Sequence, residues 1–129
     1  MILLDTCTLL WLARGEGLPP TVAARIDDPE HAIFVSAISA LEIGVKVAKG
    51  RLTLPMPLGA WWAAVLEQHG LGEVAVEAEI AIASTELPPI HLDPADRILI
   101  ATARHLGATL LTPDPLIAQY PGVTVAWTA

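Results

Sequence analysis

Four acidic residues of this chain are placed where they could build a centre for metal-dependent hydrolysis. Asp5 follows the apolar run "ILL", and Asp114 lies two residues after "TLLT". Glu42 lies in "SALEIG" and Asp96 in "DPADR". Carboxylates that converge raise one another's pKa, and bound Mg²⁺ or Mn²⁺ relieves their repulsion because hard cations take oxygen ligands. Such a cation can activate a water molecule beside a bound phosphate, so the chemistry in question is hydrolysis of a phosphodiester.

Short apolar runs alternate with longer periodic segments along the chain, and proline and glycine residues separate them. Continuous apolar runs such as "ILLD" and "AIFV" are typical of strands that are buried on both faces. We predict strands over 2–5, 32–35, 73–76, 109–112 and 123–127. We predict helices over 6–13, 20–28, 36–50, 58–70, 77–85 and 91–107, with a short helix near 114–119.

This alternation predicts the α/β class: a three-layer α/β/α sandwich with a mainly parallel sheet of about five strands. Ligands of such sheets bind beyond the carboxyl ends of the strands, near the point where the strand order reverses. Asp5 and Asp114 follow predicted strands, and Glu42 and Asp96 lie near the starts of predicted helices. We therefore expect the four carboxylates to converge on one rim of the sheet.

Each acid also fits a purely structural role. Asp5 could cap the helix that follows it, although a charge between "ILL" and "TCTLLW" favours a functional role. Glu42 follows Ser39 in a capping-box pattern and precedes Lys46 by one turn. Asp114 in "TPDP" suits a turn or a helix start. For Glu42 and Asp114 the structural and functional interpretations both remain open.

Asp93 and Asp96 flank the dipeptide "PA" in a pattern typical of a helix start. Asp93 precedes the first turn, where its carboxylate would accept a backbone N–H. At 100° per residue, Asp96 lies on a flank between the apolar stripe of Leu99 and the opposite side, which carries Arg97. We therefore predict that Asp93 caps this helix and that Asp96 faces the rim as a metal ligand.

Composition limits the classes of protein to which the chain can belong. Its 129 residues are 53% hydrophobic and 16% charged, which predicts one globular domain over residues 1–129. No apolar run reaches the roughly 20 residues of a membrane span. Asp5 interrupts the apolar start and Cys7 is the single cysteine, so we expect a cytoplasmic protein without a signal peptide. The net charge of −7 argues against nucleic acid, but two divalent cations would change it to −3.

Four segments occur in the order and spacing of PIN-domain proteins: "LLDTCTLLW", "VSAISALEIGVKVAKGRL", "HLDPADRILIATA" and "LLTPD". Over nearly its full length the chain resembles this family, and within it the VapC-type toxins, the nuclease components of bacterial toxin–antitoxin pairs. The resemblance implies a single PIN domain over 1–129 and places Thr6 and Thr112 at the border of the site. The acids that the family shares fall on Asp5, Glu42, Asp96 and Asp114.

The same resemblance implies the reaction and the partners. We expect Mg²⁺- or Mn²⁺-dependent cleavage of RNA by a homodimer, and a small antitoxin that blocks the site and binds operator DNA. Three positions depart from the usual pattern: Cys7 replaces a polar residue, Leu41 a tryptophan and Ala95 an aromatic residue. None of these departures removes a metal ligand.

The basic residues near the site have open roles. Lys46, Lys49 and Arg51 form a cluster that could hold RNA phosphates or could end a helix, whose dipole favours cations there. Arg97, next to Asp96, could orient the substrate or pair with an acid. The histidines show no metal-binding spacing, and we expect all of them on the surface or in loops: His31, His69, His91 and His105.

Two other functions remain open. A phosphatase or phosphoacceptor domain on a similar sheet would also carry an aspartate after its first strand. Cys7 stands where such a phosphatase needs a second aspartate, and no basic residue follows Arg104 as a phosphoacceptor domain would require. A PIN-like binding protein without catalysis is the other alternative, although it would have no reason to keep four carboxylates that repel one another.

Overall fold

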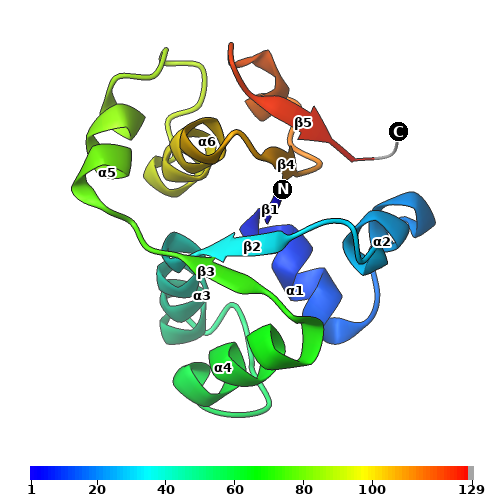
Figure 1. Cartoon of the computed structure of the whole chain (residues 1–129). Coiled ribbons are helices and arrows are strands. Elements are labelled where there is room, and N and C mark those ends of the chain that lie inside the picture. The colour runs from blue at the N-terminus through cyan, green and yellow to red at the C-terminus, as the bar shows by residue number, and fades with distance from the viewer. Residues whose placement is uncertain (128–129) are drawn as a thin grey trace.

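A computed structural model describes residues 1–127 of the chain (Figure 1). In chain order the elements are β1 (Ile2–Leu4), α1 (Thr6–Arg14), α2 (Pro20–Asp27), β2 (Ile33–Ser36), α3 (Ala37–Ala48), α4 (Leu58–His69), β3 (Gly72–Val74), α5 (Ala78–Thr85), α6 (Pro94–Leu106), β4 (Thr109–Leu111), the 3-10 helix η1 (Ile117–Gln119) and β5 (Thr124–Ala126). Every strand and helix expected from the sequence is present within a few residues of its expected ends. The helix expected over 91–107 begins only at Pro94, because Asp93 caps it.

The strands form one sheet in the order β3-β2-β1-β4-β5, and every pair of neighbours is parallel. The order reverses at the central pair, because β1 is followed in the chain by β2 on one side and is paired with β4 on the other. The predicted α/β class and parallel sheet are therefore confirmed. The point of reversal lies between the ends of β1 and β4, where a ligand site is expected.

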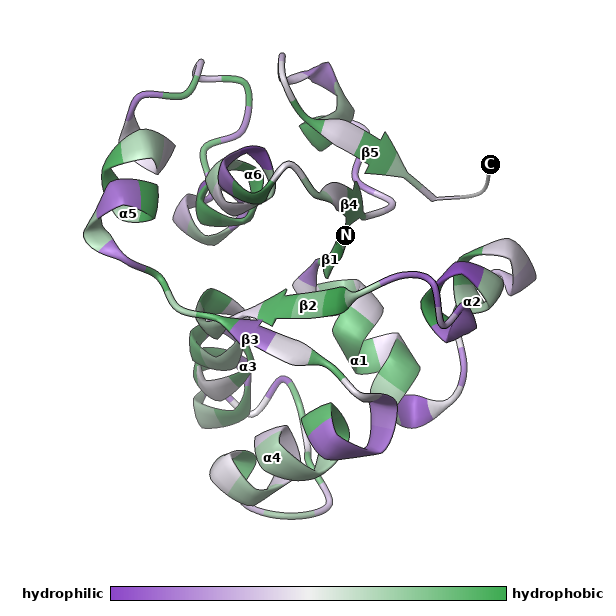
Figure 2. Cartoon of the chain, in the orientation of Figure 1, coloured by the Kyte–Doolittle hydropathy of each residue, from purple (hydrophilic) through white to green (hydrophobic). Residues whose placement is uncertain are grey.

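Alternate residues of the strands face two separate hydrophobic cores. Ile2 and Leu4 pack with α1, α2, α3 and α4 on one face, whereas Leu3 packs with α5 and α6 on the other. The same alternation divides Leu111 from Leu110 in β4. Hydropathy on the ribbon agrees for the inner strands, which are mainly hydrophobic, whereas β3 at the edge of the sheet includes a hydrophilic residue (Figure 2). Helices cover both faces of the sheet, which confirms the three-layer α/β/α sandwich.

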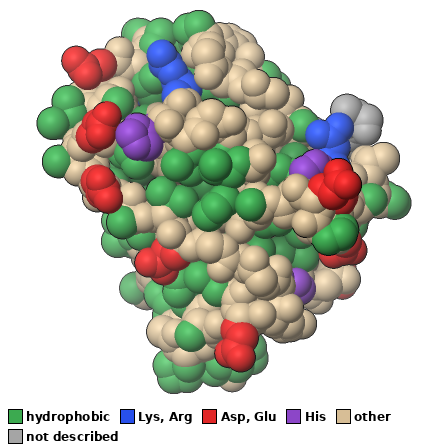
Figure 3. Space-filling view, in the orientation of Figure 1, with side chains coloured by type: hydrophobic (Ala, Val, Ile, Leu, Met, Phe, Trp, Pro, Cys, Tyr) green, Lys and Arg blue, Asp and Glu red, His purple; other side chains and the backbone are tan. Residues whose placement is uncertain are grey.

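The surface reflects the acidic composition. On the face in Figure 3, acidic side chains are scattered over several elements and basic side chains are sparse. Apolar side chains also reach the surface singly or in small groups, as is normal for a small domain. Within residues 1–127, no helix is both long enough and apolar enough to cross a membrane.

The central strand β4 provides a test of this packing. Leu110 is 0% exposed and lies in the core beneath α6, so Leu110→Ala should lower the free energy of unfolding by about 2–5 kcal/mol. Ile82 on α5 is 60% exposed, and Ile82→Ala is the matched control, with an expected change below about 0.5 kcal/mol. Urea titration followed by circular dichroism measures both. Equal losses for the two variants would contradict the packing described here.

Candidate metal-dependent active site

The central pair of strands brings Asp5 and Asp114 to one edge of the sheet. Leu4 pairs with Leu111, and the Asp5 N–H donates to the Leu111 carbonyl (3.2 Å), which sets Asp5 beside Thr112. Asp114 follows two residues later, and its N–H donates to the Thr112 hydroxyl (3.2 Å). Two acids that are far apart in the chain thus follow the carboxyl ends of neighbouring strands.

Asp5 also caps α1, so its structural role is confirmed. Its Oδ1 accepts the Thr8 N–H (2.8 Å) and the Thr8 hydroxyl (2.5 Å). The Thr112 side chain favours the charged form of the same carboxylate and lowers its pKa. Thr8 is fully buried and its hydroxyl also lies 3.2 Å from the Leu111 carbonyl. Sequence analysis missed this positioning residue, although the third residue after a helix cap is where such a bond is usual.

At the start of α6, Asp93 and Asp96 have the two different positions predicted for them. Asp93 Oδ1 accepts the Ala95 N–H (2.9 Å), which confirms Asp93 as the cap. Asp96 lies in the first turn, half-buried, and its Oδ2 is 3.1 Å from His91 Nε2. Asp96 is thus free of the capping role and turned toward the other acids.

Glu42 lies in the middle of α3, and its capping interpretation is wrong. The helix begins at Ala37, and Ser36 caps it by accepting the Ile38 N–H (3.1 Å). The predicted cap, Ser39, is instead buried with its hydroxyl 2.9 Å from that of Thr6. The Thr6 hydroxyl donates to Glu42 Oε1 (2.5 Å). Thr6 therefore holds the Glu42 carboxylate.

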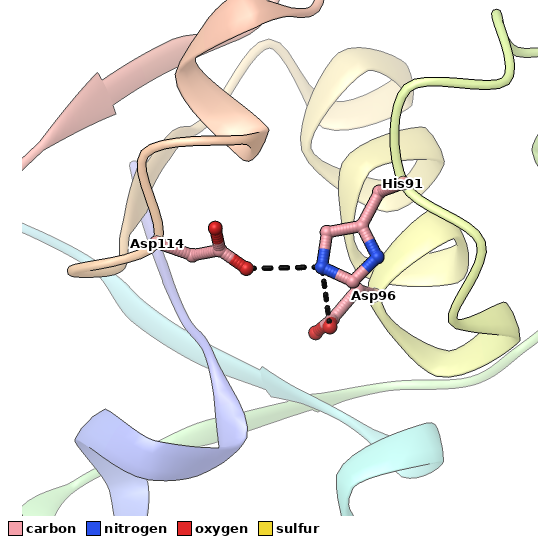
Figure 4. Close-up of side chains that lie close together, drawn as sticks. All are labelled: His91, Asp96 and Asp114. Carbon is pink, nitrogen blue, oxygen red and sulfur yellow. Dashed lines mark hydrogen bonds and ion pairs between the residues drawn. The ribbon is translucent and has the colours of Figure 1, made fainter.

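His91 is the member of the site that sequence analysis missed. Its Nε2 lies 3.1 Å from Asp96 Oδ2 and 3.0 Å from Asp114 Oδ2 (Figure 4). Nδ1 accepts the Asp93 N–H (3.2 Å), so the neutral ring carries its proton on Nε2 and directs it toward both carboxylates. His91 lies in a loop, as predicted, but its side chain is only 14% exposed. No spacing reveals it, because Asp114 is 23 residues away.

Arg97 has a different position from the one expected for a group that binds substrate. Its guanidinium donates to the carbonyl oxygens of Ser84 (3.1 Å), Leu87 (2.7 Å), Pro88 (2.9 Å) and His91 (3.1 Å). These bonds occupy the planar donor group and tie the 84–91 segment to α6. Arg97 is thus a positioning residue that fixes the backbone of His91.

Tyr120 holds the same backbone together with Arg97. The His91 N–H donates to the Tyr120 hydroxyl (2.6 Å), and this hydroxyl lies 3.3 Å from the His91 carbonyl. The ring of Tyr120 is buried in the core beneath α6. The loop that carries His91 is therefore anchored to the same core as Asp96.

The acids shift one another's pKa upward. Burial, followed by the charges of Asp93 and Glu42, raises the pKa of Asp96 to about 7, with His91 opposing. Burial also raises the pKa of Asp5, with a contribution from Asp114. For Glu42, burial raises the pKa, the Thr6 hydrogen bond lowers it, and Lys46 one turn further along α3 lowers it slightly. Burial is thus the main cause of the raised pKa values of Asp5, Glu42 and Asp96, and the charges of neighbouring acids add to it.

The donor atoms at this edge fit a divalent cation. Nε2 of His91 and one carboxylate oxygen each of Asp96 and Asp114 lie within 4.8 Å of one another. Asp5 and Glu42 add carboxylates that are electrostatically linked to this group. The carboxylate oxygens among these groups suit Mg²⁺ or Mn²⁺, and a bound cation would offset the repulsion between the carboxylates.

Comparison with known proteins agrees with this architecture. One similar protein is Ribonuclease VapC22 of Mycobacterium tuberculosis, 26% identical over 129 residues and matched over 98% of each chain. The VapBC2 complex of Rickettsia felis bound to promoter DNA matches with a TM-score of 0.75 at 18% identity, covering 98% of this chain and 99% of that chain. The DNA-bound VapBC of Salmonella typhimurium matches with a TM-score of 0.69 at 17% identity, covering 97% and 96%.

The family itself follows from a match that spans almost the whole fold. The model of the PIN domain matches residues 2–123, from β1 to the segment just before β5. All the acids described above fall inside this range. The chain belongs to the PIN-domain family.

Proposed function

We propose that this protein is a Mg²⁺- or Mn²⁺-dependent endoribonuclease that hydrolyses RNA phosphodiester bonds. The grouping of Asp96 and Asp114 with His91 within 4.8 Å, with Asp5 at the same edge of the sheet, carries the proposal, because a cation would stabilise carboxylates that lie so close together. Burial and neighbouring acids raise the pKa values of Asp5, Glu42 and Asp96, which is common at functional sites. The name of the mycobacterial relative supports RNA as the substrate. Other phosphate-handling functions lack such support among the relatives.

In this mechanism the side chains of the site divide the work. When bound, the cation supplies a Lewis acid and an activated water. Asp5, Asp96 and Asp114 provide its oxygen ligands, with Glu42 beside them. Thr8 holds the Asp5 carboxylate in place. The Nε2–H of His91 orients Asp96 and Asp114, as hydrogen bonds to metal ligands commonly do.

We further propose that the chain is the toxin of a toxin–antitoxin pair and acts in the cytoplasm. The two VapBC structures named above support this role, because both contain complexes of this kind bound to DNA. In this proposal the chain forms a homodimer, and a cognate antitoxin blocks its site. Operator DNA is contacted through the antitoxin, which is consistent with the acidic charge of this chain, −7.

The two aspartates at the start of α6 provide the sharpest test. Asp96→Asn should lower the rate of RNA cleavage at least about 100-fold, because loss of several kcal/mol of metal stabilisation costs about tenfold per 1.4 kcal/mol. Asp93→Asn is the matched control and should keep most activity, since asparagine also caps helices. Cleavage of a labelled single-stranded RNA with Mn²⁺ measures both, and circular dichroism verifies folding. If the two variants lose activity equally, the assignment of separate roles is wrong.

Metal binding can be tested without any turnover. Mn²⁺ should bind the protein in calorimetry and stabilise it by about 2.7 kcal/mol at a concentration 100 times its Kd. Excess EDTA should remove both this stabilisation and RNA cleavage. Asp5→Asn should weaken Mn²⁺ binding, because it removes one carboxylate and its charge. Glu30 is exposed on a turn away from the site, so Glu30→Gln removes the same charge and should leave the affinity unchanged. Cleavage that persists in EDTA would contradict the proposed function.

A further inference from the structure

A groove of about 330 Å³ leads away from the acidic site between α3 and the start of α6. On the α3 side, the residues that line it include Leu41, Glu42, Val45, Lys46, Lys49 and Arg51. Pro94 and Ala95 line the other side, directly before Asp96. The groove therefore includes Glu42, passes the two residues before Asp96, and runs along α3 toward its carboxyl end.

The end of α3 gathers three cations in this groove. Lys46 and Lys49 are three residues apart and share one side of the helix. Gly50 adopts a φ of +70°, and the N–H of Arg51 then donates to the Lys46 carbonyl (2.9 Å), which turns the chain back. This helix-ending motif sets Arg51 next to Lys46. Gly50, which adopts a left-handed conformation, therefore allows the turn that brings the three cations together.

These cations are unusual for so acidic a chain. The whole sequence has seven Lys and Arg residues and a net charge of −7, so nearly half of its basic residues line this one groove. Within residues 1–127, no ion pair involves Lys46, Lys49 or Arg51. Elsewhere the surface would repel a polyanion, which makes this groove the place where one could approach the site.

Apolar side chains lie between the cations and the acids. Leu41 is 61% exposed and Val45 is 42% exposed, one turn apart on α3. The helix dipole accounts for basic residues at a helix end, but it does not account for exposed aliphatic residues beside them. A surface that combines cations with apolar contacts matches a single strand of nucleic acid, which has phosphates on one side and unpaired bases on the other.

We propose that this groove binds the single-stranded RNA substrate on one side of the bond that is cleaved. Lys46, Lys49 and Arg51 contact phosphates there, and Leu41 and Val45 contact bases or riboses. The inference rests on the proposed function, since it assigns a path for the RNA of that nuclease. Charge complementarity selects this occupant, because the strand must place one phosphate beside Glu42 and Asp96 while its neighbours extend along the cations.

The salt dependence of RNA binding tests the proposal. A fluorescein-labelled single-stranded RNA is titrated with full-length Asp96→Asn protein, without metal, at several salt concentrations, and its anisotropy is measured. Each cation that contacts a phosphate contributes about 0.7 to the slope of log K against log salt. The added substitutions Lys46→Gln, Lys49→Gln and Arg51→Gln should therefore reduce this slope by about 2 in total. Arg25→Gln, on α2 at the other side of the fold, should leave it unchanged (Figure 1).

A second pair of variants tests the apolar part of the groove and does not depend on charge. Leu41→Ser and Val45→Ser should weaken binding at every salt concentration and should leave the slope unchanged. A slope that stays the same in the triple variant would overturn the proposal. The proposal would also be overturned if polyglutamate competed with the labelled RNA as well as unlabelled RNA does, and if this competition depended on the same three cations. The groove would then be a site for acidic protein.

The failure of this inference can be distinguished from the failure of the proposed function. Wild-type protein is incubated in parallel with the same RNA and Mn²⁺, and cleavage is scored. If the RNA is cleaved but its binding does not depend on the three cations, the proposal for the groove is wrong and the proposed nuclease function is unaffected. Binding that depends on the cations without any cleavage supports the groove and counts against the nuclease.

Discussion

The parallel pairing of β1 with β4 is the interaction on which the site depends. The two strands are far apart in sequence, yet they are neighbours at the centre of the sheet and their registers match residue for residue. Asp5 and Asp114, which follow the carboxyl ends of these strands, therefore lie at the same edge of the sheet. Burial of these strands on both faces supplies the hydrophobic free energy that holds the two acids together against their repulsion.

Around this centre, ordinary helix and loop contacts position each functional group. Asp5 caps α1 and is a candidate ligand at the same time, whereas at α6 the cap and the ligand are separate residues. His91 reaches Asp96 and Asp114 only because Arg97 and Tyr120 fix its backbone. Residues that touch no substrate thus decide where the reacting groups lie.

Much of the fold and part of the site could be predicted from the sequence. Apolar runs and proline or glycine breaks revealed the strands and helices, and Asp93 was identified as a cap because a cap interacts with residues next to it in the chain. His91 could not be predicted, because the atoms that it contacts come from separate segments. The role of Arg97 stayed open for a similar reason: its partners are backbone carbonyls, whose positions cannot be inferred from the types of the residues that carry them.

The distribution of the acids along the chain has a consequence for biosynthesis. Asp5 is synthesised well before Asp114, which follows β4, the strand that pairs with β1 on its second side. A nascent or truncated chain that stops before β4 lacks both the partner of β1 and one of the candidate ligands. The proposed nuclease can therefore first become active only after the segment that follows β4 has been synthesised.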